Sequence, residues 1–117
     1  MEHIIIKDVI GSELAVSTEN GAKVFALIDK YLKEGKSVTL DFSGISIMIT
    51  AFLNAAIGSL YSKKEYTGEL LNERIKLENV EPEDVTLFKD VIQRAKEYFS
   101  NKESIDRDTN SAIYGND

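Results

Sequence analysis

The stretch of residues 38–61, VTLDFSGISIMITAFLNAAIGSLY, constrains the fold of this chain more than any other. At its start apolar and polar residues alternate, so Val38, Leu40 and Phe42 point to one side of a predicted strand. A turn at SGIS follows, and apolar residues at helical spacing predict a helix from about Thr50 to residue 62. A strand followed directly by a helix is the unit from which α/β domains are built.

The first part of the chain is predicted to add strands and one helix. Residues 3–10, HIIIKDVI, are rich in β-branched residues and predict a first strand. Residues 13–16, ELAV, predict a short second strand, which would form a hairpin with the first across the Gly-Ser pair between them. A helix should begin at Ser17 or Thr18, because either hydroxyl can cap it.

The second half of the chain is predicted to end in a strand, a helix and a tail. The strand is expected near residues 75–77. EPEDV opens the last helix, because Pro82 suits a first turn and the acidic residues suit its positive end. The predicted core stripe of this helix consists of Val85, Phe88, Ile92, Ala95 and Phe99. We therefore expect one domain over residues 1–99 and a flexible polar tail over residues 100–117.

Composition narrows the classes of function. Of the 117 residues, 43% are hydrophobic and 29% are charged, which is ordinary for one globular domain. The net charge of -6 argues against binding to nucleic acid or to an anionic membrane. The chain has no cysteine, which excludes disulfides and thiolate chemistry. Because neither a signal peptide nor a long apolar run is apparent, we expect a soluble, cytoplasmic protein.

The predicted helix of residues 50–62 has two different faces. The core face carries Phe52, Leu53, Ala56, Ile57, Leu60 and Tyr61. The opposite face carries only small or uncharged residues, namely Ala51, Asn54, Ala55, Gly58 and Ser62. A solvated helix face normally carries Lys, Glu and Arg, so this face is predicted to lie against something. Either a neighbouring helix of the same domain packs there, or the face docks a partner protein.

Two polar residues near this helix are candidate functional groups. Thr50 stands where the helix should begin, and a hydroxyl there most often caps the free backbone N–H groups. The alternative is an anion site, in which the helix end would stabilise a phosphate on Thr50. Asp41 ends the preceding strand, at the edge where open α/β sheets bind ligands. A structural role, in which Asp41 accepts hydrogen bonds from a nearby turn, is the simpler interpretation.

Groups with catalytic chemistry are scarce. His3 is the only histidine, and no partner for it is apparent in the sequence. Neither GxGxxG nor GxxxxGK[ST] occurs, so no nucleotide-binding loop is predicted. Glu81, Glu83 and Asp84 cluster, but as the first turn of a helix rather than as a metal site. We therefore predict no enzymatic activity, no cofactor and no bound metal ion.

Two segments of the chain resemble the STAS domain, the module of sulphate transporters and anti-sigma-factor antagonists. The strand LDFSGI and the helix TAFLNAAIG resemble in particular a small bacterial STAS-like family of uncharacterised function. In the antagonists, a strand and a turn lead to Asp-Ser-Ser-Gly or Asp-Thr-Ser-Gly and then to a helix. Thr50 falls at the hydroxyl that is phosphorylated there, and Leu53 and Gly58 match positions in the helix. Ile49 stands where those proteins have Asp.

The resemblance implies one α/β domain with a mixed, mostly parallel sheet and helices packed mainly on one face. It also implies a non-enzymatic regulatory module that docks a partner protein, such as an ATPase-type anti-sigma kinase or another bacterial regulator. The docking residues would be Thr50, Ala51, Asn54, Ala55, Gly58 and Ser62, with Thr50 as the phosphoacceptor. The first alternative is a domain that senses a small ligand or an anion through Asp41 and the Thr50 end of the helix. A hydrolase or transferase is the second alternative, and the oligomeric state stays open.

Overall fold

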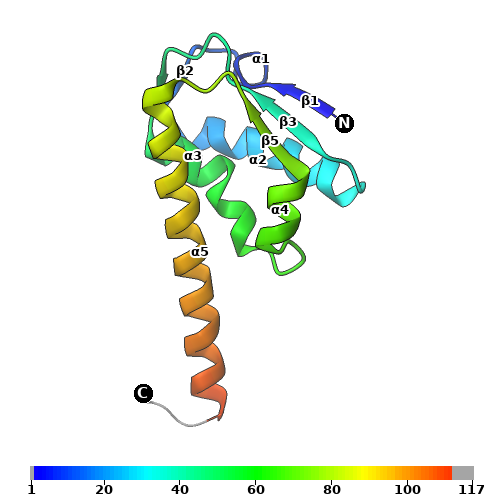
Figure 1. Ribbon diagram of the computed structural model, residues 1–117, viewed down its shortest axis with the longest axis vertical. Helices are drawn as coiled ribbons and strands as arrows, with labels where there is room; N and C mark the ends of the chain where they lie inside the picture. The colour runs from blue at the N-terminus through cyan, green and yellow to red at the C-terminus, as the bar shows by residue number, and fades with distance from the viewer. Residues whose placement is uncertain (1, 112–117) are drawn as a thin grey trace.

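The computed structural model describes the backbone of residues 2–111 and the side chains of residues 2–99. Strands and helices alternate along the chain, and the long last helix extends beyond the rest of the domain (Figure 1). In chain order the elements are β1 (Glu2–Ile5), α1 (Ile6–Ile10), β2 (Leu14–Ala15), α2 (Thr18–Lys33), β3 (Val38–Asp41), β4 (Ile47–Met48), α3 (Thr50–Ala56), the 3-10 helix η1 (Gly58–Ser62), α4 (Gly68–Arg74), β5 (Ile75–Glu78) and α5 (Pro82–Ser111).

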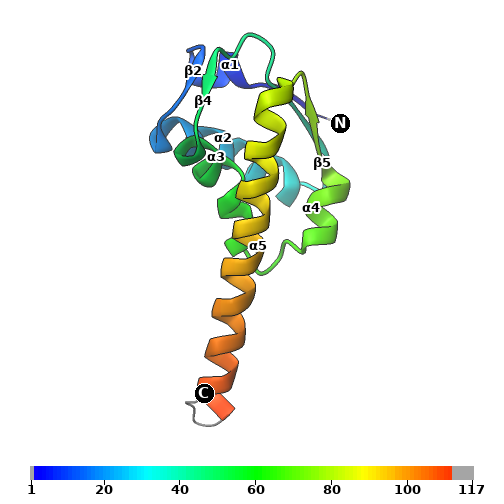
Figure 2. The ribbon, with the colours of Figure 1, turned by 60° about the vertical axis from the view of Figure 1, so that its left-hand side comes forward.

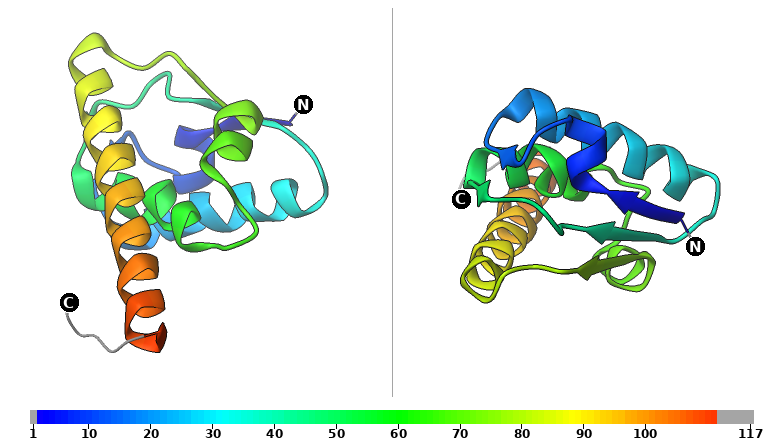
Figure 3. Two further views of the ribbon diagram at one scale, coloured as in Figure 1. Left: turned by 60° about the horizontal axis from the view of Figure 1, so that its bottom comes forward. Right: turned by 90° about the horizontal axis from the view of Figure 1, so that it is seen from above.

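Strands β1, β3 and β5 form a parallel sheet with β3 in its centre. Ile4, Leu40 and Leu77 lie side by side across the three strands. The right-hand view of Figure 3 looks onto this sheet, with most of the helices behind it. The predicted α/β class, the mostly parallel sheet and the packing of helices mainly on one face are therefore confirmed.

The hydrophobic core lies between the sheet and these helices. Phe52, Leu53, Ile57 and Leu60 were predicted to be buried, and each is at most 4% exposed. Helix α5 packs against η1 and α3, and Figure 2 shows it crossing this side of the domain. The periodicity of residues 50–62 therefore predicted the buried side of this segment correctly, although the segment consists of α3 followed by η1 rather than one continuous helix.

Helices α2 and α3 approach each other closely at Gly21. A β-carbon placed on Gly21 would lie 2.5 Å from the carbonyl oxygen of Phe52 and 2.7 Å from Cβ of Ala55. Both distances are too short for atoms that are not bonded, so any larger residue would have to push the two helices apart. Gly21 therefore sets how closely α3 can approach α2.

The beginning of the chain folds differently from the prediction. The predicted strand over residues 3–10 is wrong beyond Ile5, because the chain continues as α1. Ile6 and Ile10 lie one helical turn apart and both are buried, so core packing overrides the β preference of their side chains. The predicted hairpin is also wrong, because β2 pairs in parallel with β4 instead of pairing with β1.

The second half of the chain shows three further differences. Helix α4 was not predicted; Thr67 caps it by accepting a hydrogen bond from the Leu70 N–H group at 3.1 Å. Val85 was predicted to be in the core but is 40% exposed, whereas Val91 is buried. Helix α5 continues through residues 100–111, the part predicted to be a flexible tail. How mobile that region is stays a prediction, and residues 112–117 lie outside the described residues.

Candidate functional site

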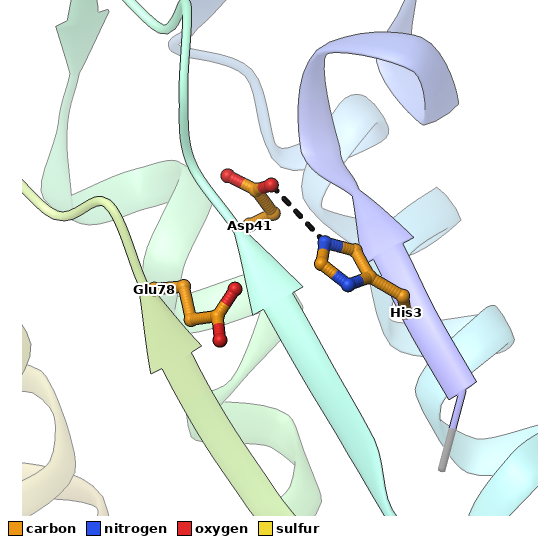
Figure 4. Close-up of side chains that lie close together, drawn as sticks. All are labelled: His3, Asp41 and Glu78. Carbon is orange, nitrogen blue, oxygen red and sulfur yellow. Dashed lines mark hydrogen bonds and ion pairs between the residues drawn. The ribbon is translucent and has the colours of Figure 1, made fainter.

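Side chains from three neighbouring strands converge on the open face of the sheet. They are His3 on β1, Asp41 at the end of β3 and Glu78 at the end of β5 (Figure 4). One nitrogen or oxygen atom of each side chain lies within 4.8 Å of one atom from each of the other two. His3 Nε2 and Asp41 Oδ2 are 3.1 Å apart, which is hydrogen-bonding distance.

The parallel register explains why these three side chains meet. Asp41 pairs with Ile5 on one side and with Glu78 on the other. His3 precedes Ile5 by two positions and therefore points to the same face, because side chains alternate along a strand. His3 therefore has a partner in Asp41 that the sequence alone did not reveal. His3 and Asp41 are 38 residues apart, so only strand pairing brings them together.

The carboxylate of Asp41 is held in one orientation by the residues that follow β3 and β5. Its Oδ1 atom accepts hydrogen bonds from the Ser43 backbone N–H group and from Asn79 Nδ2, both at 2.9 Å. Asn79 adopts the left-handed region at φ 58, which asparagine tolerates better than most residues. The hydrogen bonds from Asn79, Ser43 and His3 hold the pKa of Asp41 well below its usual range. Asp41 is therefore ionised, with its Oδ2 atom on the side of His3.

The three-residue cluster is open to solvent and carries negative charge. The side chain of His3 is 51% exposed and that of Asp41 is 13% exposed, while Glu78 is exposed. Two carboxylates that face the same space disfavour an anion and favour a cation. The anion-sensing alternative for Asp41 stays a prediction, because Lys76, in register with His3 through Thr39, lies on the same face of the sheet as the two carboxylates. The partners of the Asp41 side chain are His3, Ser43 and Asn79, which places it in a different cluster from Thr50.

A second surface feature is the two-stranded ribbon of β2 and β4. Leu14 lies in register with Ile47, and Ala15 lies in register with Met48. Ala15 and Met48 are buried, whereas Leu14 is 46% exposed and Ile47 is 53% exposed. The ribbon therefore turns one side to the core and an apolar side to solvent.

The exposed apolar side of the ribbon continues to the start of α3. Val16 and Ile49, the next residues along the two strands, are 38% and 42% exposed. The Ile49 N–H group donates to the Ala15 carbonyl oxygen at 3.1 Å, so the pairing persists to this point. We call the surface formed by Leu14, Val16, Ile47 and Ile49 the apolar ribbon surface. Thr50 follows it directly in the chain.

Thr50 does not cap α3, and the prediction that it does is wrong. The N-cap position belongs to Ile49, which makes no side-chain capping hydrogen bond, and Thr50 is the first helical residue. Thr50 is partly buried. A cap requires extended backbone geometry, and Ile49 has it at φ -124 and ψ 166. Whether Thr50 is phosphorylated stays a prediction.

The small residues predicted to dock a partner do not all lie on one exposed surface. Ala55 lies against Gly21 of α2, and Gly58 is buried, with Val91 and Ala95 of α5 nearby. At these two positions the structure favours the interpretation as packing inside the domain. The other three residues are less enclosed: Ala51 is partly buried, whereas Asn54 and Ser62 are exposed.

Comparison with known proteins identifies the family. The model of a family described as a STAS-like domain of unknown function matches residues 20–85. The chain belongs to this family. The predicted membership is thereby confirmed. Neither curated proteins nor solved structures gave a match to the chain.

The matched part of this STAS-like domain extends from α2 past β5. It contains β4, Thr50 and the whole of α3, and it contains Asp41 and Glu78. His3 and β2 lie before it, so both surface features are completed by residues outside the matched range. Within residues 2–111, no helix combines the length and the apolar character needed to cross a membrane.

Proposed function

We propose that this STAS-like domain is a non-enzymatic regulatory module that binds another protein at the beginning of α3. The observation that supports this most is the apolar ribbon surface, which ends next to Thr50. Four large apolar side chains face solvent there, Leu14 in register with Ile47, and Val16 and Ile49 next along the chain, whereas Ala15 and Met48 between them are buried. Contiguous exposed apolar side chains are typical of surfaces that bind partners.

The surroundings of the apolar ribbon surface suit an interface with an apolar centre and a polar rim. Near the start of β4, Ser46 Oγ donates a hydrogen bond to Glu13 Oε1 at 2.7 Å. Thr50 and the exposed Asn54 extend the rim along α3. Specific interfaces bury about 800 Å² on each partner, so the four apolar side chains would form the centre of the contact and this rim the remainder.

The proposed partner is a protein whose contact surface is apolar at its centre. An ATPase-type kinase or a similar regulator fits the resemblance to anti-sigma-factor antagonists. Of the docking residues suggested by the sequence, Thr50 and Ala51 follow Ile49 directly in the chain, and Asn54 lies one turn further along α3. Ala55 and Gly58 contact α2 and α5, and we assign them a packing role.

The test is capture of the partner by wild-type protein, followed by binding measurements with two matched variants. The tagged chain captures the partner from an extract of the source organism, and mass spectrometry identifies it. Ile47→Glu places a charge in the centre of the apolar ribbon surface, and we expect affinity for that partner to fall about tenfold or more. Leu77→Glu places the same charge at an exposed leucine on β5, and affinity should be unchanged.

Urea unfolding of both variants establishes first that each is folded. Equal affinity of the wild type, Ile47→Glu and Leu77→Glu for the captured protein would contradict the proposed interface. Failure of the wild type to bind the purified partner directly would contradict the proposed function itself.

A further inference from the structure

We propose that His3, Asp41 and Glu78 bind a divalent transition-metal ion, with Zn²⁺ as the representative of its class, on the open face of the sheet. This inference is independent of the proposed docking function. It concerns the sheet of β1, β3 and β5 and uses none of the residues of the apolar ribbon surface.

The chemistry of the three side chains selects the class of metal. The set offers one imidazole nitrogen and two carboxylate oxygens, all of which Zn²⁺ accepts as ligands. Mg²⁺ and Ca²⁺ prefer sites built from oxygen atoms alone, so an imidazole ligand favours a transition metal over either. Three protein ligands would leave a further position for water or for a group from another molecule.

The distances permit an ion to bind with small side-chain movements. Bonds from Zn²⁺ to nitrogen or oxygen are about 2.1 Å long, which places neighbouring ligand atoms of a tetrahedral site about 3.4 Å apart. His3 Nε2 and Asp41 Oδ2 are already 3.1 Å apart, and the ligand atoms of all three residues lie within 4.8 Å of one another. Since His3 and Glu78 are exposed, their side chains can rotate to close the remaining gap.

Asp41 is oriented in the way that metal-binding carboxylates commonly are. Its Oδ1 atom is engaged by the Ser43 N–H group and by Asn79 Nδ2, while Oδ2 faces His3. Hydrogen bonds of this kind fix a ligand before the ion arrives, and their loss typically weakens metal binding about 10- to 100-fold. The side chain of Asp41 is also less exposed than that of His3, so its position is set by the protein.

The experiment uses the imidazole of His3 as the NMR reporter of metal binding. His3 is the only histidine in the chain, so its imidazole proton resonances can be followed by NMR without ambiguity. Titration of wild-type protein with Zn²⁺ should shift these resonances with saturation at one equivalent. In Glu78→Gln, which keeps the reporter, the Zn²⁺ concentration for half-saturation should rise about tenfold or more. Glu73→Gln removes an exposed carboxylate on α4 and should titrate like the wild type.

Two further measurements make the outcome decisive. The heat of Zn²⁺ binding measured by calorimetry should be lost in His3→Gln, and Mg²⁺ should not shift the His3 resonances at the same concentrations. Identical titrations of the wild type and Glu78→Gln would overturn the site, because a lone histidine also binds Zn²⁺ weakly. Equal responses to Mg²⁺ and Zn²⁺ would overturn the assigned class of metal.

Discussion

The hydroxyl group of Tyr66 donates a hydrogen bond of 2.6 Å to Oδ1 of Asp29. Tyr66 lies just before α4 and is buried, and Asp29 lies on α2. The Asp29 Oδ2 atom is 3.1 Å from Lys33 Nζ, so both oxygens of this carboxylate are engaged. The hydrogen bond from Tyr66 is the largest cause that lowers the pKa of Asp29. This contact ties the segment before α4 to α2.

Replacing Tyr66 with Phe should destabilise the domain. The variant keeps the buried ring but removes the donor to a charged carboxylate, which typically costs about 1.5–3 kcal/mol. Urea unfolding at neutral pH measures the difference in the free energy of unfolding. Tyr98→Phe is the control, because Tyr98 is 60% exposed and should tolerate the change. Equal stability of Tyr66→Phe and the wild type would contradict the role of this hydrogen bond.

The stability of the domain should fall in acid, in part because of Asp41. Its pKa is lowered in the folded state, first by the hydrogen bond from Asn79, so ionised Asp41 favours folding. This contribution is fully present above the unfolded pKa of about 3.9 and is lost as the pH falls from there through the folded pKa. Asp41→Asn should therefore be less stable than the wild type at pH 7, and the difference should shrink below about pH 4. A difference that stays constant on acidification through this range would argue against this origin.

Two substitutions at Gly58 should have opposite outcomes. A β-carbon on Gly58 would lie 3.5 Å from Asn54 Oδ1 and 3.7 Å from Val91 Cγ1, which is ordinary contact. Gly58→Ala should therefore be neutral or stabilise by about 0.4–1 kcal/mol, because alanine restricts the unfolded chain. Gly58→Arg cannot fit against α5 and should cost about 1–3 kcal/mol or more. Thermal unfolding checks both substitutions. If Gly58→Arg is as stable as the wild type, Gly58 does not pack inside the domain and remains a candidate docking residue.

Substitutions at Thr50 separate capping from regulation. Because Thr50 is not the cap of α3, Thr50→Ala should cost less than the roughly 0.5–2 kcal/mol of a lost cap. Thr50→Glu should be tolerated for stability, since a negative charge suits the first turn of a helix. If phosphorylation of Thr50 controls docking, Thr50→Glu should weaken partner binding and Thr50→Ala should not. Equal partner affinities for the wild type and both variants would falsify this switch.

Local patterns in the sequence predicted the centre of the fold. The alternation in β3 and the periodicity of residues 50–62 identified the central strand and the buried face of the helical segment. They failed at residues 3–10, where Ile6 and Ile10 fit both a strand by composition and a helix by spacing. Burial of both residues decided the outcome, and burial depends on contacts that sequence patterns do not contain.

The candidate sites were predicted less well than the fold. The sequence singled out Asp41, but His3 and Glu78 join it only through the register of β1, β3 and β5. The apolar ribbon surface did leave a local signal, since LAV and IMI both place a core residue between two large apolar ones. Each segment is too short to be recognised as half of a pair without knowledge of the other.

The close approach at Gly21 should leave a trace in the evolution of this family. The atom nearest to a side chain at position 21 is the carbonyl oxygen of Phe52, which belongs to the backbone. No substitution elsewhere removes a backbone atom, so a larger residue at position 21 requires the two helices to move apart. In relatives with a larger residue at position 21, α3 must lie at a different distance from α2. Ile49 and Thr50, at the start of α3, would move with it. The residue at this one position should therefore divide the family into groups whose surfaces at the start of α3 differ in shape.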